Sequence, residues 1–226
     1  MTVLVLAAHP DDEILGCGGT VARLAAGGEE VQCVIFGEGI ASRYAKPGKA
    51  AKGEIAALHK KSKKANSIIG VKETRFHDLP DNKFDSVPLL EIVKLVESAI
   101  ERCSPSTIFT HHGGDLNIDH VLLFRAVMTA ARPLKGSPVR EIYTFPVPSS
   151  TDWAFQNFSP VFKPNTFFDI SGTLETKIKA LKEYDSEMRP SPHARSYENV
   201  ENIARQWGEV TGTGAAEAFE LVLKTV

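Results

Sequence analysis

The sequence predicts an α/β fold in which a mostly parallel central sheet carries helices on both faces. Short apolar, β-rich segments alternate with longer amphipathic segments along the chain, which is typical of α/β proteins. Several strand segments are apolar at successive positions, as parallel strands buried on both faces are. With 226 residues, no internal repeat and no linker-like tract, we expect one domain over residues 1–226.

Each expected strand is a short apolar run bounded by turn residues. The first, Thr2–Ala8, is too short for a helix and ends just before Pro10. The second, Val31–Phe36, follows Gly27 and Gly28 and completes a β-α-β unit. The others are expected at 74–77, 106–110, 141–145, 166–170 (an edge strand) and 217–222.

Each expected helix is a longer segment with apolar residues at helical spacing. The clearest is Leu89–Glu101, in which every third or fourth residue is apolar. A glycine pair ends the first helix and Pro133 stops the fourth. The expected helices are 20–26, 49–69, 89–101, 121–131, 174–183 and 198–211. In the common strand order 3-2-1-4-5, strands one and four are neighbours.

Composition is that of an ordinary globular chain, with 42% apolar and 24% charged residues. The net charge of −2 gives no reason to expect nucleic acid or an anionic membrane as a partner. No apolar run approaches the ~20 residues of a membrane-spanning helix, and no secretion signal is evident. Three widely spaced cysteines favour a reducing compartment, so we expect a cytoplasmic protein. Association into a homo-oligomer is left open.

The first cluster of polar side chains, His9-Pro10-Asp11-Asp12-Glu13, directly follows the first strand. Imidazole and carboxylate groups are ordinary zinc ligands. Pro10 forces a sharp turn that could point His9 and Asp12 at one ion and leave Asp11 beside it as a base. A capped helix start would explain the same residues without a metal, because Asp is a good N-cap.

A second cluster, which includes residues 111–115 and 117–120, follows the fourth strand. The ends of strands one and four meet at the switch point of the predicted sheet, where ligands bind, so both clusters belong to one site. His120 falls in the first turn of the next helix, which Asn117 or Asp119 could cap. Two His and one Asp would leave a fourth zinc position for water, as in catalytic sites.

Further candidate residues lie in loops expected around the same site. Each of these residues can equally be an exposed or turn-forming residue. In segment 146–164, four aromatic side chains suit stacking on a sugar or base, or anchoring of the loop. The other loop residues singled out are Glu38, Arg43 and Tyr44, Asp85, and His193 and Arg195. As substrate-binding candidates we select Arg43, Asp85, Asp115 and Arg195.

Taken together, the motifs resemble those of the PIG-L or LmbE-like family of zinc-dependent N-deacetylases. The resemblance implies a Rossmann-like sheet and zinc ligands at His9, Asp12 and His120. It also implies that Asp11 is the general base, and that the substrate is an N-acetyl amino sugar, free, glycosidic, or nucleotide- or lipid-linked. The segments that carry it are Ala8–Glu13, Gly16–Thr20, Asn117–His120 and Ala215–Phe219.

The second motif departs from the family pattern, which is His-Pro-Asp-His. Asn117 stands where the family has a His that stabilises the oxyanion and is assigned to protonation of the leaving amine. An amide can donate a hydrogen bond to an oxyanion but cannot deliver a proton. The acid is therefore His112, His193 or Asp11 acting in both directions, and we expect His112 because it ends the fourth strand.

Two other functions remain open from the sequence. Asn117 favours a non-catalytic sugar-binding protein that keeps the metal for recognition, and another amide hydrolase would use the same parts. Asp11 favours an enzyme, because a carboxylate beside the metal has no evident binding duty. The sequence thus predicts a zinc-dependent N-deacetylase, with another divalent metal as the alternative to zinc, acting on a small N-acetyl amino sugar.

Overall fold

The computed structural model describes residues 1–40 and 49–226, with only the backbone of residues 49–51. The strands form one seven-stranded sheet in the order β3-β2-β1-β4-β5-β7-β6. Strands β1 to β5 are parallel, and β7 runs antiparallel to both β5 and β6. The strands are β1 (Thr2–Ala7), β2 (Glu30–Gly37), β3 (Glu73–Leu79), β4 (Thr107–His111), β5 (Glu141–Phe145), β6 (Thr166–Asp169) and β7 (Ala216–Lys224). The predicted order 3-2-1-4-5 and the edge position of β6 are confirmed.

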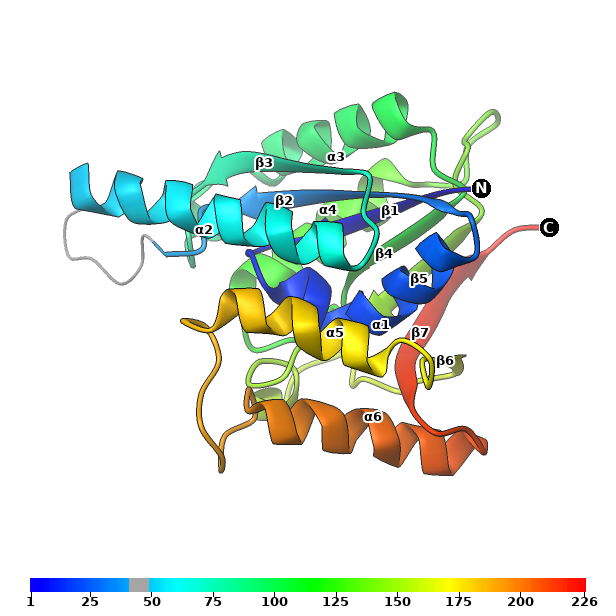
Figure 1. Ribbon diagram of the computed structural model, residues 1–226. Helices are drawn as coiled ribbons and strands as arrows, with labels where there is room; N and C mark the ends of the chain where they lie inside the picture. The colour runs from blue at the N-terminus through cyan, green and yellow to red at the C-terminus, as the bar shows by residue number, and fades with distance from the viewer. Residues whose placement is uncertain (41–48) are drawn as a thin grey trace.

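Helices cover both faces of this sheet, as Figure 1 shows. One face carries α3 (Leu89–Cys103) and α4 (Ile118–Ala130). The other carries α1 (Asp12–Ala26), α2 (Lys49–Ile68), α5 (Leu174–Leu181) and α6 (Tyr197–Thr211). Along β1, Leu4 and Leu6 pack toward the first layer and Val3 and Val5 toward the second. This two-sided burial explains why the strand is apolar at successive positions.

The central position of β1 brings the two polar clusters together. β1 pairs in parallel with both neighbours, so that Val5 lies opposite Cys33 of β2 and Phe109 of β4. The residues after β1 and those after β4 therefore emerge side by side at one edge of the sheet.

Helix α1 begins at Asp12, well before the Thr20 expected from the sequence, and is kinked at Cys17, where φ is −144°. That prediction was wrong, because the glycine-rich segment before Thr20 is itself part of the helix. At Gly16 the glycine serves close packing. A Cβ added there would lie 2.1 Å from the ring of Phe145, so only glycine lets α1 approach β5.

A buried ion pair, here called the clasp, satisfies the backbone groups exposed by this kink. Glu217 of β7 accepts hydrogen bonds from the amides of Gly19 (3.0 Å) and Thr20 (2.7 Å). Lys177 of α5 donates to the carbonyl of Leu15 at 2.8 Å and to Glu217 at 2.6 Å. The last strand therefore fixes the shape of the first helix.

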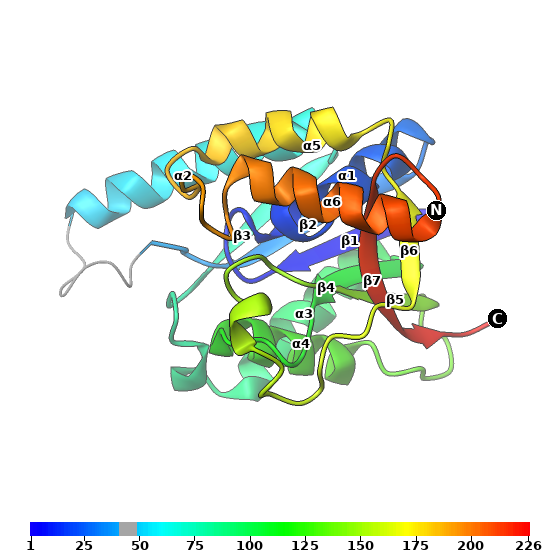
Figure 2. The ribbon, with the colours of Figure 1, turned by 90° about the horizontal axis from the view of Figure 1, so that it is seen from below.

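Segment 146–164 is a long connection with one short 3-10 helix, Asp152–Ala154. Further 3-10 turns occupy Phe84–Ser86 and Lys182–Tyr184. Seen from below, α6 runs beside β7 and α5 (Figure 2). In the ranges covered by the structure, none of the helices combines the length and the apolar character needed to cross a membrane. Cys17, Cys33 and Cys103 are buried free thiols.

Candidate metal centre

The turn between β1 and α1 is held in an unusual backbone conformation. Asp11 has φ of 114°, which an L-residue adopts only when its surroundings impose it. Its amide donates to Glu13 Oε2 at 3.0 Å. Glu13 Oε1 in turn accepts from Asn66 of α2 at 2.7 Å and from the Tyr184 hydroxyl at 2.5 Å. Glu13 thus ties the turn to two distant segments, and its burial raises its pKa to about 7.

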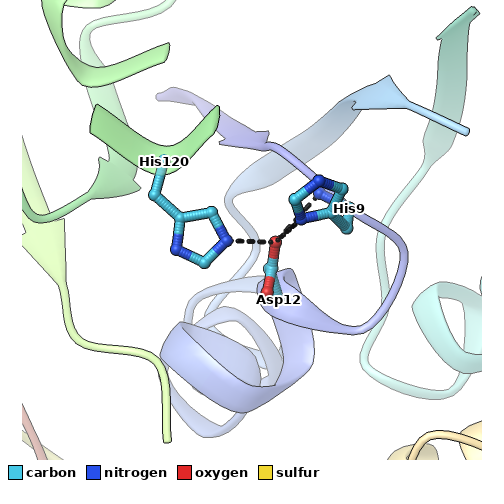
Figure 3. Close-up of side chains that lie close together, drawn as sticks. All are labelled: His9, Asp12 and His120. Carbon is cyan, nitrogen blue, oxygen red and sulfur yellow. Dashed lines mark hydrogen bonds and ion pairs between the residues drawn. The ribbon is translucent and has the colours of Figure 1, made fainter. Parts of the chain in front are cut away.

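His9, Asp12 and His120, here called the metal trio, converge at the end of β1. Figure 3 shows the two imidazole rings on either side of the Asp12 carboxylate. Asp12 Oδ2 lies 3.3 Å from His9 Nδ1 and 3.3 Å from His120 Nε2. Tetrahedral zinc with bonds of about 2.1 Å holds neighbouring ligand atoms about 3.4 Å apart. The spacing of the trio therefore fits a divalent ion.

Each histidine of the trio is oriented by a carboxylate on its far side. Asp119 Oδ2 lies 2.9 Å from His9 Nε2, and it also accepts the amide of Asn82 at 2.7 Å. Asp115 Oδ1 lies 3.2 Å from His120 Nδ1. Carboxylates that hold the second nitrogen of a metal-binding imidazole fix its tautomer and direction. The nitrogens turned toward Asp12 are thereby held in position.

The electrostatics of the trio also fit a bound cation. Burial alone lowers the pKa of His9, but Asp119 and Asp12 outweigh it and raise the pKa to about 10. The same balance holds for His120: burial lowers its pKa, but Asp12 and Asp115 raise it to about 9. Buried Asp12 Oδ1 has no hydrogen-bond partner among the described residues. The buried carboxylates around the trio favour a cation between them. A metal ion can replace the protons that His9 and His120 otherwise carry.

A second set of metal-type residues, His9, Asp81 and Asp119, shares His9 with the trio. Here His9 Nε2 lies 2.9 Å from Asp119 and 3.4 Å from Asp81. The shorter distance is that of a hydrogen bond rather than of two ligands around one ion. We therefore interpret Asp81 and Asp119 as the support of His9.

Asp11 lies beside the trio without belonging to it. Its side chain is only 2% exposed, and Oδ2 accepts from Arg195 Nη1 at 2.7 Å. Arg195 Nε donates to Ser149 Oγ at 2.7 Å and to the Pro148 carbonyl at 3.2 Å. Burial raises the pKa of Asp11 well above its ordinary value, although Arg195 opposes that shift. A buried carboxylate of this kind can take up a proton.

The expectation that His112 reaches the site is wrong. His112 is turned away: its Nε2 lies 2.8 Å from the Pro160 carbonyl and its Nδ1 lies 3.0 Å from Glu220. His111 instead stacks on His120, with ring centroids 3.9 Å apart, and its Nε2 accepts the amide of Ala8. Neighbouring residues of a strand point to opposite faces, so only one of the two histidines can face the trio.

Two further catalytic candidates have structural partners. Asn117 caps α4, with its Oδ1 accepting the amide of Asp119 at 2.9 Å and its Nδ2 donating to Asn82 at 3.1 Å. His193 is half-buried in the loop that carries Arg195, and its Nδ1 accepts the Arg195 amide at 3.0 Å. The cap interpretation of Asn117 is therefore confirmed, and His193 supports the loop rather than contacting the trio.

The four predicted substrate-binding residues lie in different surroundings, and two of them contact side chains of the site. Asp115 is 3% exposed and is occupied by His120 and by the hydroxyls of Ser150 and Thr151. Arg195 is paired with Asp11, and Asp85 is exposed in the 3-10 turn after β3, with no hydrogen bond or ion pair to the trio among the described residues. Arg43 lies outside the described residues. Asp115 and Arg195 thus belong to the site, but as supports of its side chains.

The sequence interpretation missed the supporting roles of Glu13, Asp115 and Asp119. Their burial was the missing information, because a carboxylate in a polar motif looks like a surface or ligand group until its partners are known. One usable signal was present. Asp115 and Asp119 both precede His120 within five residues, and metal-binding histidines commonly have a carboxylate on the second nitrogen.

Comparisons with known proteins give the family of this chain. Residues 4–131 match the family described as PIG-L, GlcNAc-PI de-N-acetylase. An uncharacterised deacetylase of Escherichia coli, YaiS, is 27% identical over 81% of this chain and 90% of its own length. Diacetylchitobiose deacetylase of Thermococcus kodakarensis is 25% identical over 97% of this chain and 82% of its own. Both relatives are named as deacetylases.

A solved structure with the same fold has a different activity. The 4-carboxy-2-hydroxymuconate hydratase of Pseudomonas putida, GalB, superposes with a TM-score of 0.77 at 20% identity, covering 100% of this chain and 97% of that one. The fold therefore serves a hydratase as well as deacetylases. The family match spans both polar clusters and the whole metal trio, so this chain belongs to the PIG-L family of de-N-acetylases.

Proposed function

We propose that this protein is a metal-dependent hydrolase, with zinc as its metal, that removes the acetyl group from an N-acetylated amino sugar. The observation that carries the proposal is the buried carboxylate of Asp11 next to a metal trio to which it does not contribute. Amide hydrolysis needs a Lewis acid and a separate base, and these residues supply the positions of both.

A cation held by His9, Asp12 and His120 would supply Lewis acidity toward water and toward the amide carbonyl. Asp11 accepts the proton of the attacking water. Arg195 keeps the Asp11 carboxylate in place through its bonds to Ser149 and Pro148. Asp119 and Asp115 hold the imidazoles of the trio in the required tautomers.

The leaving amine must still receive a proton, and we assign its return to Asp11. An amide such as Asn117 has no proton to deliver, and both ring nitrogens of His112 contact groups away from the trio. With a pKa raised by burial, Asp11 is suited to accept a proton and give it back. The basic limb of the pH–rate profile should therefore survive in both His112→Ala and His193→Ala.

The substrate class is supported by the relatives. One relative is named as acting on diacetylchitobiose, and the matched family is described by GlcNAc-PI. Both names denote N-acetylated glucosamine in different chemical settings. We therefore propose an N-acetylglucosamine derivative as the substrate of this chain.

The test is metal-dependent acetate release from a panel of N-acetyl amino sugars. Protein stripped with a chelator should be inactive and zinc should restore turnover. Asp11→Asn should keep the metal and lose roughly 10²-fold or more in turnover, the size of a lost general base. If the zinc-loaded protein binds these sugars and releases no acetate, the chain is a sugar-binding protein instead.

A further inference from the structure

A cavity of about 560 Å³ lies between segment 146–162 and helix α6. Most of its wall is apolar and comes from α1, α6, β7 and this segment. Four aromatic residues contribute to the wall: Phe155, Phe158, Phe162 and Trp207. The volume falls in the range of pockets that hold small organic ligands.

The cavity shares its wall with the residues that support the catalytic groups. Thr151 lines it, and the Thr151 hydroxyl donates to Asp115 at 2.6 Å, the carboxylate that orients His120. Pro148 also lines it, and its carbonyl accepts from Arg195, the partner of Asp11. Two wall residues of the cavity thus contact the side chains that support His120 and Asp11.

The polar side chains of the wall leave little for a sugar ring to bond. Lys177 and Glu217 are buried and bond to each other and to the backbone of α1. Thr151 is committed to Asp115, so Asp152 and Gln156, which are exposed to solvent, are the polar side chains of the wall that could bond an occupant. Sugar hydroxyls moved into such a wall would lose their bonds to water without replacement. An apolar occupant has no hydrogen bonds to water to lose.

The outer part of the wall carries exposed aromatic surface. Phe155 is 74% exposed and Phe158 is 48% exposed, and Trp153 of the same segment is 43% exposed. Three large exposed rings within six residues, next to an apolar cavity, form the kind of patch that marks a binding site.

We propose that this cavity binds an apolar aglycone of the substrate, so that the enzyme acts on an N-acetyl amino sugar joined to an aryl or alkyl group. The inference rests on the proposed function for the position of the sugar. The aglycone packs against α6 and segment 146–162 while the acetamido group lies at the trio. The cavity then selects among amino sugars by what is attached to them.

Binding of simple glucosides tests the cavity without any acetyl group. Calorimetry with methyl, hexyl and phenyl β-glucosides should give a dissociation constant at least about tenfold lower for hexyl or phenyl than for methyl. Ile203→Asp on α6 and Phe155→Ser should each abolish that difference. Val210→Asp is the matched control, because Val210 is 65% exposed on the same helix and does not line the cavity.

Phe155 is largely exposed, so its variant tests the cavity even if Ile203→Asp fails to fold. Equal dissociation constants for all three glucosides, or a difference that survives in a folded lining variant, would overturn the inference. Rates of acetate release from the matching N-acetylglucosaminides separate this result from the proposed function. Selective binding of hexyl or phenyl glucoside without acetate release would support the aglycone cavity and contradict the proposed deacetylase function. Acetate release with equal dissociation constants for the three glucosides and equal rates for the three N-acetylglucosaminides would support the deacetylase function and contradict the aglycone cavity.

Discussion

Arg195 Nη1 lies 2.7 Å from Asp11 Oδ2, which joins the loop before α6 to the turn after β1. The guanidinium reaches Ser149 with a second nitrogen, so one side chain fixes the base and a third segment together. The position of the proposed base is thus set by residues far from it in sequence.

Replacing Arg195 by Lys should lower turnover by about tenfold to hundredfold with the metal retained. Lysine keeps the charge but has one nitrogen in place of the Nε and Nη1 that bond Ser149 and Asp11, so the carboxylate is less well placed. Acetate release and metal content measure the two effects. Arg205→Lys, at an exposed site on α6, serves as the control. Unchanged turnover in Arg195→Lys would show that the function of Asp11 does not depend on the two-nitrogen geometry of the Arg195 guanidinium.

His120→Ala should lose both metal and activity, whereas His112→Ala should keep its metal. The two residues belong to one sequence cluster, but only His120 contacts Asp12. Elemental analysis of the purified variants is the measurement. A His120→Ala protein with stoichiometric metal would remove this residue from the ligand set.

Asp119→Asn should weaken metal binding by about 10- to 100-fold, the usual effect of losing a carboxylate behind a metal-binding imidazole. The amide is nearly isosteric, so the bonds from the amides of Asn82 and Phe84 can partly persist. Competition with a chromophoric chelator gives the affinity, with exposed Asp85→Asn as the control. Equal affinities for both variants would contradict the role assigned to Asp119.

Metal binding should release protons at neutral pH. Without metal, the pKa of His9 is about 10 and that of His120 about 9, so both imidazoles are protonated at pH 7. A metal requires both to be neutral, so affinity should rise with pH until it levels off above these pKa values. Calorimetry at pH 7 in buffers of different ionisation enthalpy counts the protons. Binding without proton release would show that the histidines are not the ligands.

Lys177→Met should lower the free energy of unfolding by about 3–5 kcal/mol, because it leaves Glu217 buried without its cationic partner. Lys179→Met, exposed on the same helix, should have little effect. Urea unfolding of both variants makes the comparison. Equal midpoints would mean that the clasp contributes nothing to stability.

The sequence was sufficient for the order of the five parallel strands and for the meeting of the two polar clusters, but not for the antiparallel insertion of β7 between β5 and β6. Both follow from local patterns: apolar runs, helical spacing and the rule that ligands bind where neighbouring parallel strands end. A cytoplasmic location stays a prediction from the unpaired cysteines.

The errors concern properties that no local pattern encodes. Whether His111 or His112 faces the trio depends on the register of β4 against its neighbours. Whether Asp115 binds substrate or a histidine depends on burial, and the pairing of Arg195 with Asp11 depends on how two distant loops pack. The helical segment around Gly16 was not predicted, because Gly16 packs against Phe145 of strand β5, which is far away in the sequence.

The clasp also orders events during synthesis of the chain. The residues of the trio leave the ribosome early, since all precede α4's second turn, whereas Glu217 belongs to β7, which inserts between β5 and β6. Until β7 arrives, the amides of Gly19 and Thr20 lack their acceptor and the kinked helix behind Asp12 is unsupported. A nascent chain therefore contains all three residues of the trio before the clasp that supports the helix behind Asp12 can form.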